Sequence, residues 1–310
     1  MKNRMQPLVR QYLAYRRKLG FRLRQAGGSL AHFSRFADRT APGQPLTVAL
    51  ALRWIHTLDD IHPSTRTAYL RAIRCFARFC VAIDPRTELL PTRLIGPNYI
   101  RRAPHIYSAD QVRLLMRRAV RLTPTIHSPL RPQTFETMIG LVATTGIRLG
   151  EMLRLRSGDF DAAAGTLRVP QAKFSPERVL PLHPSTVCAL VRYEAQRRRR
   201  CPCSERFFAG PCGRPVPVRT ADKQFRELAH GIVANGARPV VRWTDFRHSF
   251  ATHWVATWSR TRAPVGHHLL LLRRYLGHRS FECTWWYVSA DPGALKAASQ
   301  RFFHHHHAPP

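Results

Sequence analysis

Five basic or hydrogen-bonding side chains stand in local contexts that core packing does not explain. They are Arg148 in TTGIRLGEML, Lys173 in AKFSPER, Arg247 in TDFRHSF, His278 in LGHRS, and Tyr287, nine residues after His278. Arg247 stands at the head of an apolar, helix-like stretch, where packing alone does not call for a guanidinium. Arginine binds phosphate oxygens through paired N–H groups, so these residues suggest chemistry on an anionic substrate.

Each of these residues also has a simpler interpretation when it is taken alone. Arg148 can form an ion pair with Glu151, three residues further along one helix. Lys173 can be a surface lysine in a turn, and His278 can cap a helix end. Tyr287 follows two tryptophans and can belong to an aromatic core patch.

Four motifs containing these residues occur together and in one order: GIRLGE, KxxxERVxPL, DFRHSFATH and YLGHxSxxxTxxY. Together they resemble the tyrosine recombinases, the phage-integrase and Xer-like superfamily. The resemblance covers about residues 1–303. It is strongest over the four segments 140–155, 173–182, 244–253 and 275–287, and the joint pattern outweighs the simpler interpretations.

The resemblance implies a site-specific DNA recombinase or integrase that uses neither a metal nor another cofactor. Arg148 and Arg247 would stabilise the charge of the phosphoryl transition state. Tyr287 would attack phosphorus and form a 3′-phosphotyrosine, leaving a free 5′-hydroxyl. Lys173 would protonate the 5′-oxygen, and His278 would hydrogen-bond the scissile phosphate. Such enzymes serve DNA integration, transposition and other movements of mobile elements.

Thr244 departs from the family pattern, which has histidine or sometimes lysine three residues before the second arginine. Threonine can donate one hydrogen bond but cannot act as an acid or a base near neutral pH. His248 is a family feature with a structural role. The threonine leaves open a second function, a catalytically impaired DNA-binding protein on the same fold. A type IB topoisomerase ranks behind both, because the helical residues 1–83 and the short catalytic domain look Xer-like.

The charge of the chain points to nucleic acid independently of the motifs. Lys and Arg number 50 against 18 Asp and Glu among 310 residues, a formal net charge of +32. A polyanion must offset such a charge, or self-repulsion destabilises the compact state. Double-stranded DNA is favoured over RNA by the resemblance, and over an anionic membrane by the arginine content. A GC-rich genome would explain arginine in place of lysine, but not the shortage of acidic residues.

Residues 1–88 are predicted to form a helical DNA-binding domain. Apolar periodicity indicates helices over 7–21, 29–39, 46–58 and 63–83. Ser29 is the expected cap of the second helix, and Ser64 or Thr65 that of the fourth. The fourth helix has an apolar stripe, and its arginines lie largely off that stripe and are predicted to bind DNA: Arg66, Arg71, Arg74 and Arg78.

Residues 89–106 hold prolines and basic side chains and are predicted to be an extended linker. Arg101 and Arg102 in this linker are candidate DNA ligands. The catalytic domain is predicted over 107–303. Ser108 and Gln111 form a capping-box pattern at its first helix.

The catalytic domain combines helical periodicity with one strand pattern. Two short strands are expected around Leu167 to Val169 and Val179 to Leu180, joined by QAKFSPE. Helices are expected at 134–147, 148–155, 185–196, 221–233, 244–258 and 267–277. The run Arg197–Arg200 closes one helix and is either a phosphate patch or a solvated helix end.

The predicted fold class is therefore mainly α with a small β-sheet. The resemblance implies a two-domain DNA clamp, a helical core-binding domain with an α+β catalytic domain. It also implies a homotetramer on two DNA sites, with a related recombinase as a possible partner. The segment after Tyr287 would either pass to a neighbouring subunit or fold back on its own domain. Residues 304–310, with His304–His307, are taken as a flexible tail.

The remaining sequence features favour a cytoplasmic protein. Seven cysteines are scattered, which suits a reducing compartment. Cys201, Cys203 and Cys212 are a weak zinc pattern because a fourth ligand is missing, so no metal site is assigned. The N-terminal residues lack the apolar region of a signal peptide, and no apolar run reaches the ~18 residues of a membrane span.

Overall fold

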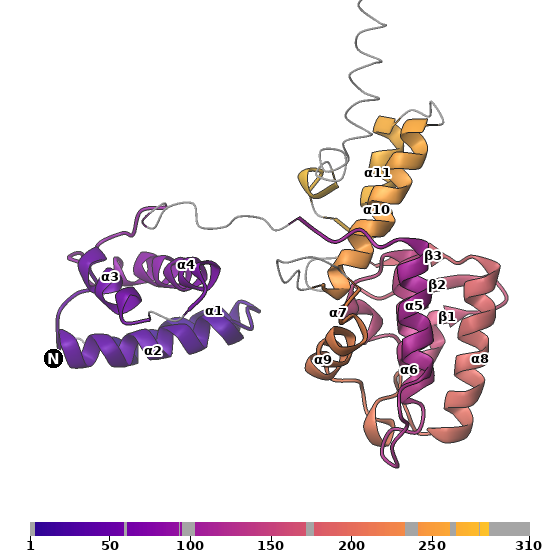
Figure 1. The fold of residues 1–310 in the computed structure, drawn as a ribbon. Coiled ribbons are helices and arrows are strands. Elements are labelled where there is room, and N and C mark those ends of the chain that lie inside the picture. The colour runs from indigo at the N-terminus through magenta and orange to yellow at the C-terminus, as the bar shows by residue number, and fades with distance from the viewer. Residues whose placement is uncertain are drawn as a thin grey trace, which may run out of the picture. The chain divides into compact units, whose positions relative to one another are not determined.

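The computed structural model divides the chain into two compact units, Met1–Arg102 and Ala103–Pro310. It describes residues 4–58, 61–92, 94, 103–171, 177–232, 241–260, 265–278 and 280–284. Figure 1 shows the elements of both units.

The first unit is a small helical bundle. Its helices are α1 (Met5–Lys18), α2 (Arg24–Thr40), α3 (Val48–His56) and α4 (Pro63–Cys80). Helix α2 contacts the other three. The fully buried side chains of Phe33, Trp54 and Phe76 come from three different helices and lie in one apolar cluster. The predicted helices are therefore present, and their apolar faces supply the core.

Two caps differ from the sequence predictions. Ser29 lies inside α2, which begins at Arg24, and its hydroxyl donates to the Ala26 carbonyl. The cap of α4 is His62, whose side chain accepts from the Ser64 backbone N–H. Both errors have one cause, because apolar periodicity locates a helix but does not fix its first residue.

The second unit starts with an extended segment that packs against the rest of the unit. The Tyr107 backbone N–H donates to the Ser249 hydroxyl over 2.8 Å, and the Tyr107 ring stacks on Phe246. Ser108 and Gln111 then form the predicted capping box at the start of α5 (Ala109–Val120). Leu90, which lies in the predicted linker 89–106, belongs to the apolar cluster of the first unit.

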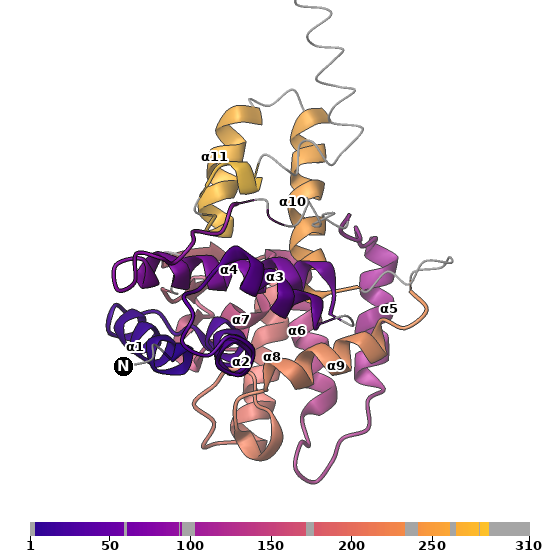
Figure 2. The ribbon, with the colours of Figure 1, turned by 90° about the vertical axis from the view of Figure 1, so that its left-hand side faces the viewer.

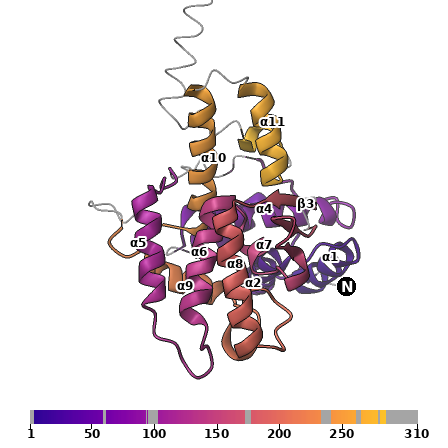
Figure 3. The same cartoon turned by 90° about the vertical axis from the view of Figure 1, so that its right-hand side faces the viewer.

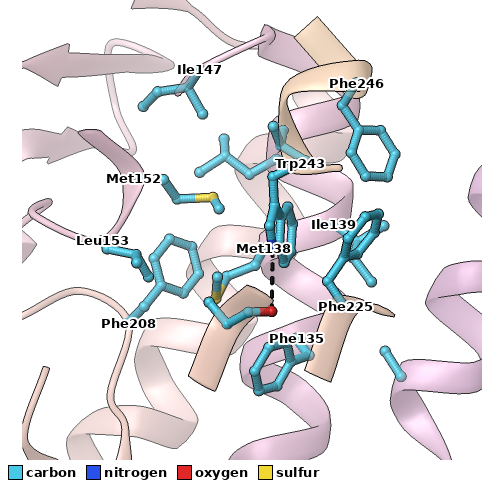
Figure 4. Packing of buried hydrophobic residues seen from close by; sticks show 14 of the residues in the cluster. Phe135, Met138, Ile139, Ile147, Met152, Leu153, Phe208, Phe225, Trp243 and Phe246 are labelled. Atoms are coloured by element: carbon cyan, nitrogen blue, oxygen red, sulfur yellow. Dashed lines mark hydrogen bonds between the residues drawn. The ribbon is translucent and has the colours of Figure 1, made fainter. Parts of the chain in front are cut away.

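Helix α6 (Arg131–Thr145) is the centre of the second unit. It lies between α5 and α8 (Pro184–Arg200), as Figure 3 shows. It also contacts α10 (Trp243–Arg260) and the short α7 (Leu149–Met152). Helix α9 (Val218–Leu228) contacts α5. Figure 4 shows the core between these elements, with Trp243 of α10 donating to the Ala221 carbonyl of α9.

The predicted hairpin is present as β2 (Thr166–Val169) and β3 (Arg178–Pro181), which pair antiparallel with Leu167 opposite Leu180. Leu167, Val169 and Leu180 are buried on one face. A further strand, β1 (Phe160–Asp161), completes a sheet in the order β1–β2–β3. Its two residues are too few for an alternation pattern, so the sequence did not reveal it.

Helices α10 and α11 (Val265–Leu276) pack side by side, and Figure 2 shows them extending together from the second unit. Their contact is a separate apolar cluster of Ala251, Val255, Leu269, Leu272 and Leu276. The end of α11 also contacts β3. This packing brings the last turn of α11 next to the residues that follow α6.

The arginine run Arg197–Arg200 and two short 3₁₀ turns complete the description of the second unit. The run Arg197–Arg200 ends α8 as predicted, but Arg197 is buried and donates to the Ser204 carbonyl and the Ser157 hydroxyl. Short 3₁₀ turns occur at Ser157–Asp159 and Pro211–Gly213. In the described part of the chain, no helix has the length and apolar character needed to cross a bilayer.

Candidate active site

Arg148 is held at the start of α7, where the backbone is extended. Its guanidinium donates to the Glu151 carboxylate over 2.8 Å and to the Gly277 carbonyl over 3.1 Å. The ion pair with Glu151, the simpler interpretation of this arginine, is therefore present. The second bond ties the same side chain to the end of α11, and the side chain remains 37 % exposed.

Arg247 projects from the first turns of α10 into the interior and is only 6 % exposed. It donates to the Gly146 carbonyl over 3.0 Å and also to the Leu276 carbonyl. Gly146 caps the C-terminus of α6, and Leu276 is the last residue of α11. Carbonyls at helix C-termini lack intrahelical donors and carry partial negative charge. Two helix ends therefore hold this arginine.

Gly146 allows this close approach. Its φ is +61°, and a Cβ there would lie 3.0 Å from the Phe250 ring and 3.3 Å from Leu276. A side chain would be strained by the backbone conformation and would also require the Phe250 or Leu276 side chain to shift. The glycine in GIRLGE is thus the point at which α6, α10 and α11 meet.

Glu151 and Arg178 support Arg148, and the sequence interpretation did not assign either of them a place in the site. Both side chains are almost fully buried, and Arg178 donates to Glu151 over 2.7 Å and to the Tyr275 carbonyl over 2.7 Å. Burial raises the pKa of Glu151, but Arg178 and Arg148 outweigh it and hold the pKa at about 2. Arg178 is the arginine of the motif KxxxERVxPL, so its position in that motif could have indicated that it belongs to the site.

His278 is the second residue after α11 and lies near both arginines. Burial and the charges of Arg247 and Arg148 lower its pKa to about 3. The ring is therefore neutral near pH 7. Its Nδ1 shares a 2.8 Å hydrogen bond with the hydroxyl of Thr284, which is fully buried. This bond orients the ring, and Thr284 is a further site residue that the sequence interpretation did not assign.

Thr244 is the second residue of α10 and is exposed. It precedes Arg247 by three residues, so the two lie on the same face of the helix. The departure from the family pattern is thus at a surface position next to the buried arginine. His248 is half-buried, and its charge contributes to the lowered pKa of His278.

Several predicted site residues lie outside the described residues: Lys173, Tyr287, Arg101 and Arg102. Lys173 falls between β2 and β3, and Tyr287 falls three residues after Thr284. Their roles remain predictions.

The arginines of α4 separate into two kinds. Arg66 donates to the Leu58 carbonyl, and Arg74 donates to the carbonyls of Leu90 and Pro91. These two side chains fasten neighbouring segments to the helix. Arg71 and Arg78 are exposed, as a phosphate-binding role requires.

The three cysteines that formed the weak zinc pattern are free thiols. Among the described residues, no group of three His, Cys, Asp or Glu side chains is arranged to hold a metal ion. The chemistry available from the described residues is instead cationic: two guanidiniums and a neutral imidazole converge where α6, α10 and α11 end or begin.

Comparison with known proteins gives consistent matches over both units. The model of the phage integrase family matches residues 108–293. A putative integrase/recombinase of Sinorhizobium fredii is 32% identical over 300 residues, covering 94% of this chain and 95% of that protein. The tyrosine recombinase XerC of Chlamydia pneumoniae is 25% identical over 74% of this chain and 69% of its own.

A solved structure shows the same fold. The Tn1549 transposon integrase in complex with transposon right end DNA has a TM-score of 0.70 at 13% identity, covering 99% of this chain and 100% of that chain.

Proposed function

Because this chain belongs to the phage integrase family, we propose that it is a site-specific DNA recombinase of the tyrosine type. It would cut and rejoin DNA strands through a covalent 3′-phosphotyrosine. The observation that carries this proposal is the convergence of Arg148, Arg247 and His278 in a chain with a net charge of +32.

Arg148 and Arg247 would bind the non-bridging oxygens of the scissile phosphate. Each is held by a backbone carbonyl at the end of α11, so little reorganisation is needed when charge develops in the transition state. Because Nδ1 of His278 is engaged with the Thr284 hydroxyl, its Nε2 would donate one hydrogen bond to the phosphate.

Tyr287 would supply the nucleophile. Its phenol loses its proton to water, the phenol oxygen attacks phosphorus, the bond to the 5′-oxygen breaks, and Lys173 gives that oxygen a proton. The phosphotyrosine conserves the bond energy, so the 5′-hydroxyl of a second strand can reverse the step without ATP. Neither side chain is among the described residues, and both roles rest on the motifs.

The oligomeric assembly and the biological setting are also proposals. We propose a homotetramer on two DNA sites, with a related recombinase as a further possible partner. The fold shared with a transposon integrase supports a role in a mobile element. Because its substrate would be DNA, the activity would belong in the cytoplasm.

A covalent-trapping assay tests the proposal. DNA from the flanks of the gene is nicked so that the cleaved strand diffuses away, and an SDS-resistant protein–DNA band is sought. We expect the adduct to map to Tyr287 and to vanish in Tyr287→Phe, while DNA binding persists. Salt-sensitive binding without an adduct would contradict the proposal and favour a DNA-binding protein without the cleavage step.

Thr244→His separates these two functions. The position is exposed, so the imidazole can be accommodated without repacking the core. A general acid or base contributes typically ~10²–10⁴-fold to a rate, so we expect faster adduct formation in this variant. Thr244→Val is the matched control because it removes the hydroxyl and keeps the shape. If only Thr244→His formed an adduct, the natural chain would be the impaired relative.

A further inference from the structure

A second basic site lies beside the first one and has no role in the chemistry described above. A cavity of about 300 Å³ is bordered by Arg154, Arg156, Arg168 and Arg206, and we refer to it as the arginine pocket. Its size is at the lower end of the range for small-ligand sites. Arg154 and Arg156 follow α7, Arg168 is on β2, and Arg206 precedes the buried Phe207.

The carboxylates on the wall of the arginine pocket do not balance its charge. Glu151 is already paired with Arg148 and Arg178. Asp159 is paired with Arg168 over 2.8 Å. Within the described part of the chain, no carboxylate lies within the 4.0 Å ion-pair distance of Arg154, Arg156 or Arg206. Three guanidiniums therefore border one cavity with their charge unbalanced.

The side chains are placed for an external ligand. Arg154 and Arg156 are exposed, so they are accessible from solvent. Arg206 donates through Nη1 to the Arg154 carbonyl over 2.6 Å, which fixes its guanidinium at the pocket wall. The planar fork of arginine matches the oxygens of a phosphate group. Gathering like charges around a cavity is unfavourable unless an anion enters it.

The arginine pocket is also adjacent to the candidate active site. Glu151 borders the pocket and also bonds to Arg148. Pro170 and Gln171, at the end of β2, complete the wall, and the connection to β3 that holds Lys173 follows them in the sequence. Arg148 and Arg247 do not line the pocket, so an anion there would be distinct from the scissile phosphate.

We propose that the arginine pocket binds a phosphate group other than the scissile one. The group belongs either to the DNA backbone, in which case the inference rests on the proposed function and extends it, or to a free polyphosphate such as a nucleotide. Both sources present the same chemistry, and the experiment distinguishes them.

The test compares the full-length chain with two double variants. Arg154→Gln/Arg156→Gln removes two charges from the pocket, at exposed side chains that form no ion pair with a described carboxylate. Arg192→Gln/Arg219→Gln removes two charges from exposed positions of α8 and α9 and is the matched control. Thermal unfolding checks that both fold, and the single variant Arg156→Gln replaces the pocket variant if it does not.

Two equilibrium measurements are made on each protein. One is the salt dependence of binding to duplex DNA, and the other is calorimetric binding of inorganic tripolyphosphate. For a DNA phosphate, we expect the slope of log K against log[salt] to fall by about 1 in the pocket variant relative to the control. For a free polyphosphate, we expect tripolyphosphate affinity to fall about tenfold or more, as weakening of a charge-assisted hydrogen bond implies, while the DNA slope matches the control.

The proposal is overturned if neither the slope nor the tripolyphosphate affinity differs between the pocket variant and the control. Because both readouts are binding equilibria, they do not depend on cleavage. A chain that forms no Tyr287 adduct but shows either result would contradict the cleavage step of the proposed function and leave the pocket inference standing, because the DNA measurement requires only DNA binding.

Discussion

Arg247 and Arg148 donate to consecutive carbonyls at the end of α11, Arg247 to Leu276 and Arg148 to Gly277. The two arginines come from different elements and are 99 residues apart in sequence (247 − 148). One helix end therefore sets the distance between the two cationic groups. Anything that moves the last turn of α11 should disturb both of them together.

Gly146→Ala tests this junction. Alanine at φ +61° costs about 1–2 kcal/mol in backbone strain, and its Cβ also meets Phe250 at 3.0 Å. Gly165→Ala is the control, because Gly165 has φ +63° but its Cβ would meet nothing nearer than 3.8 Å. We expect Gly146→Ala to lower the free energy of unfolding more than the control does in urea denaturation. Equal decreases would show that the approach to Phe250 carries no cost.

Glu151→Gln should destabilise the protein strongly. The change leaves the buried Arg178 without its carboxylate, and breaking a buried ion pair costs about 3–5 kcal/mol. Asp110→Asn is the comparison, since it removes an exposed pair with Arg113 that is worth at most about 1 kcal/mol. Chemical denaturation measures both. A decrease at Glu151 no larger than that at Asp110 would contradict the buried pair.

The low pKa of Glu151 predicts how the stability difference between wild type and Glu151→Gln depends on pH. A carboxyl whose folded pKa is about 2, below its unfolded value of about 4.3, stabilises the fold above the unfolded value. The contribution disappears as pH falls from there towards 2. The stability gap between wild type and Glu151→Gln should therefore be full at pH 6 and shrink in acid.

The lowered pKa of His278 predicts a second pH range over which folding stability changes. Its folded pKa is about 3, below the unfolded value of about 6.5, so the unfolded chain binds the proton first. Stability is full above pH 6.5 and declines as pH falls from there towards 3. His278→Asn should flatten this part of the profile. NMR titration of the ring should also show a higher pKa when vanadate offsets the charges of Arg148 and Arg247.

The arginines of α4 should divide by function. Arg71→Gln and Arg78→Gln change exposed side chains, so we expect weaker DNA binding and unchanged stability. The salt slope should fall by about 1 for each phosphate that a variant no longer binds. Arg74→Gln removes bonds to Leu90 and Pro91 and should lower the thermal stability of the first unit. Identical behaviour of all three variants would contradict this division.

The sequence alone determined the fold class, most helices and the β2–β3 hairpin, because these depend on apolar periodicity and turn residues that are local in the chain. The capping box of Ser108 and Gln111 was readable for the same reason. The four motifs also determined the family, since residue type and order survive without coordinates. Helix starts were less secure, as Ser29 and His62 show.

Only the tertiary structure decided which charges support one another. Arg178 and Glu151 are 27 residues apart, and nothing local in the sequence says that a strand arginine is buried against a helix carboxylate. The same holds for the carbonyls of Leu276 and Gly277, whose role depends on where α11 ends. It also holds for the arginine pocket, which gathers residues from 151 to 206. Pairing of buried charges depends on packing across the fold, and packing is not periodic along the chain.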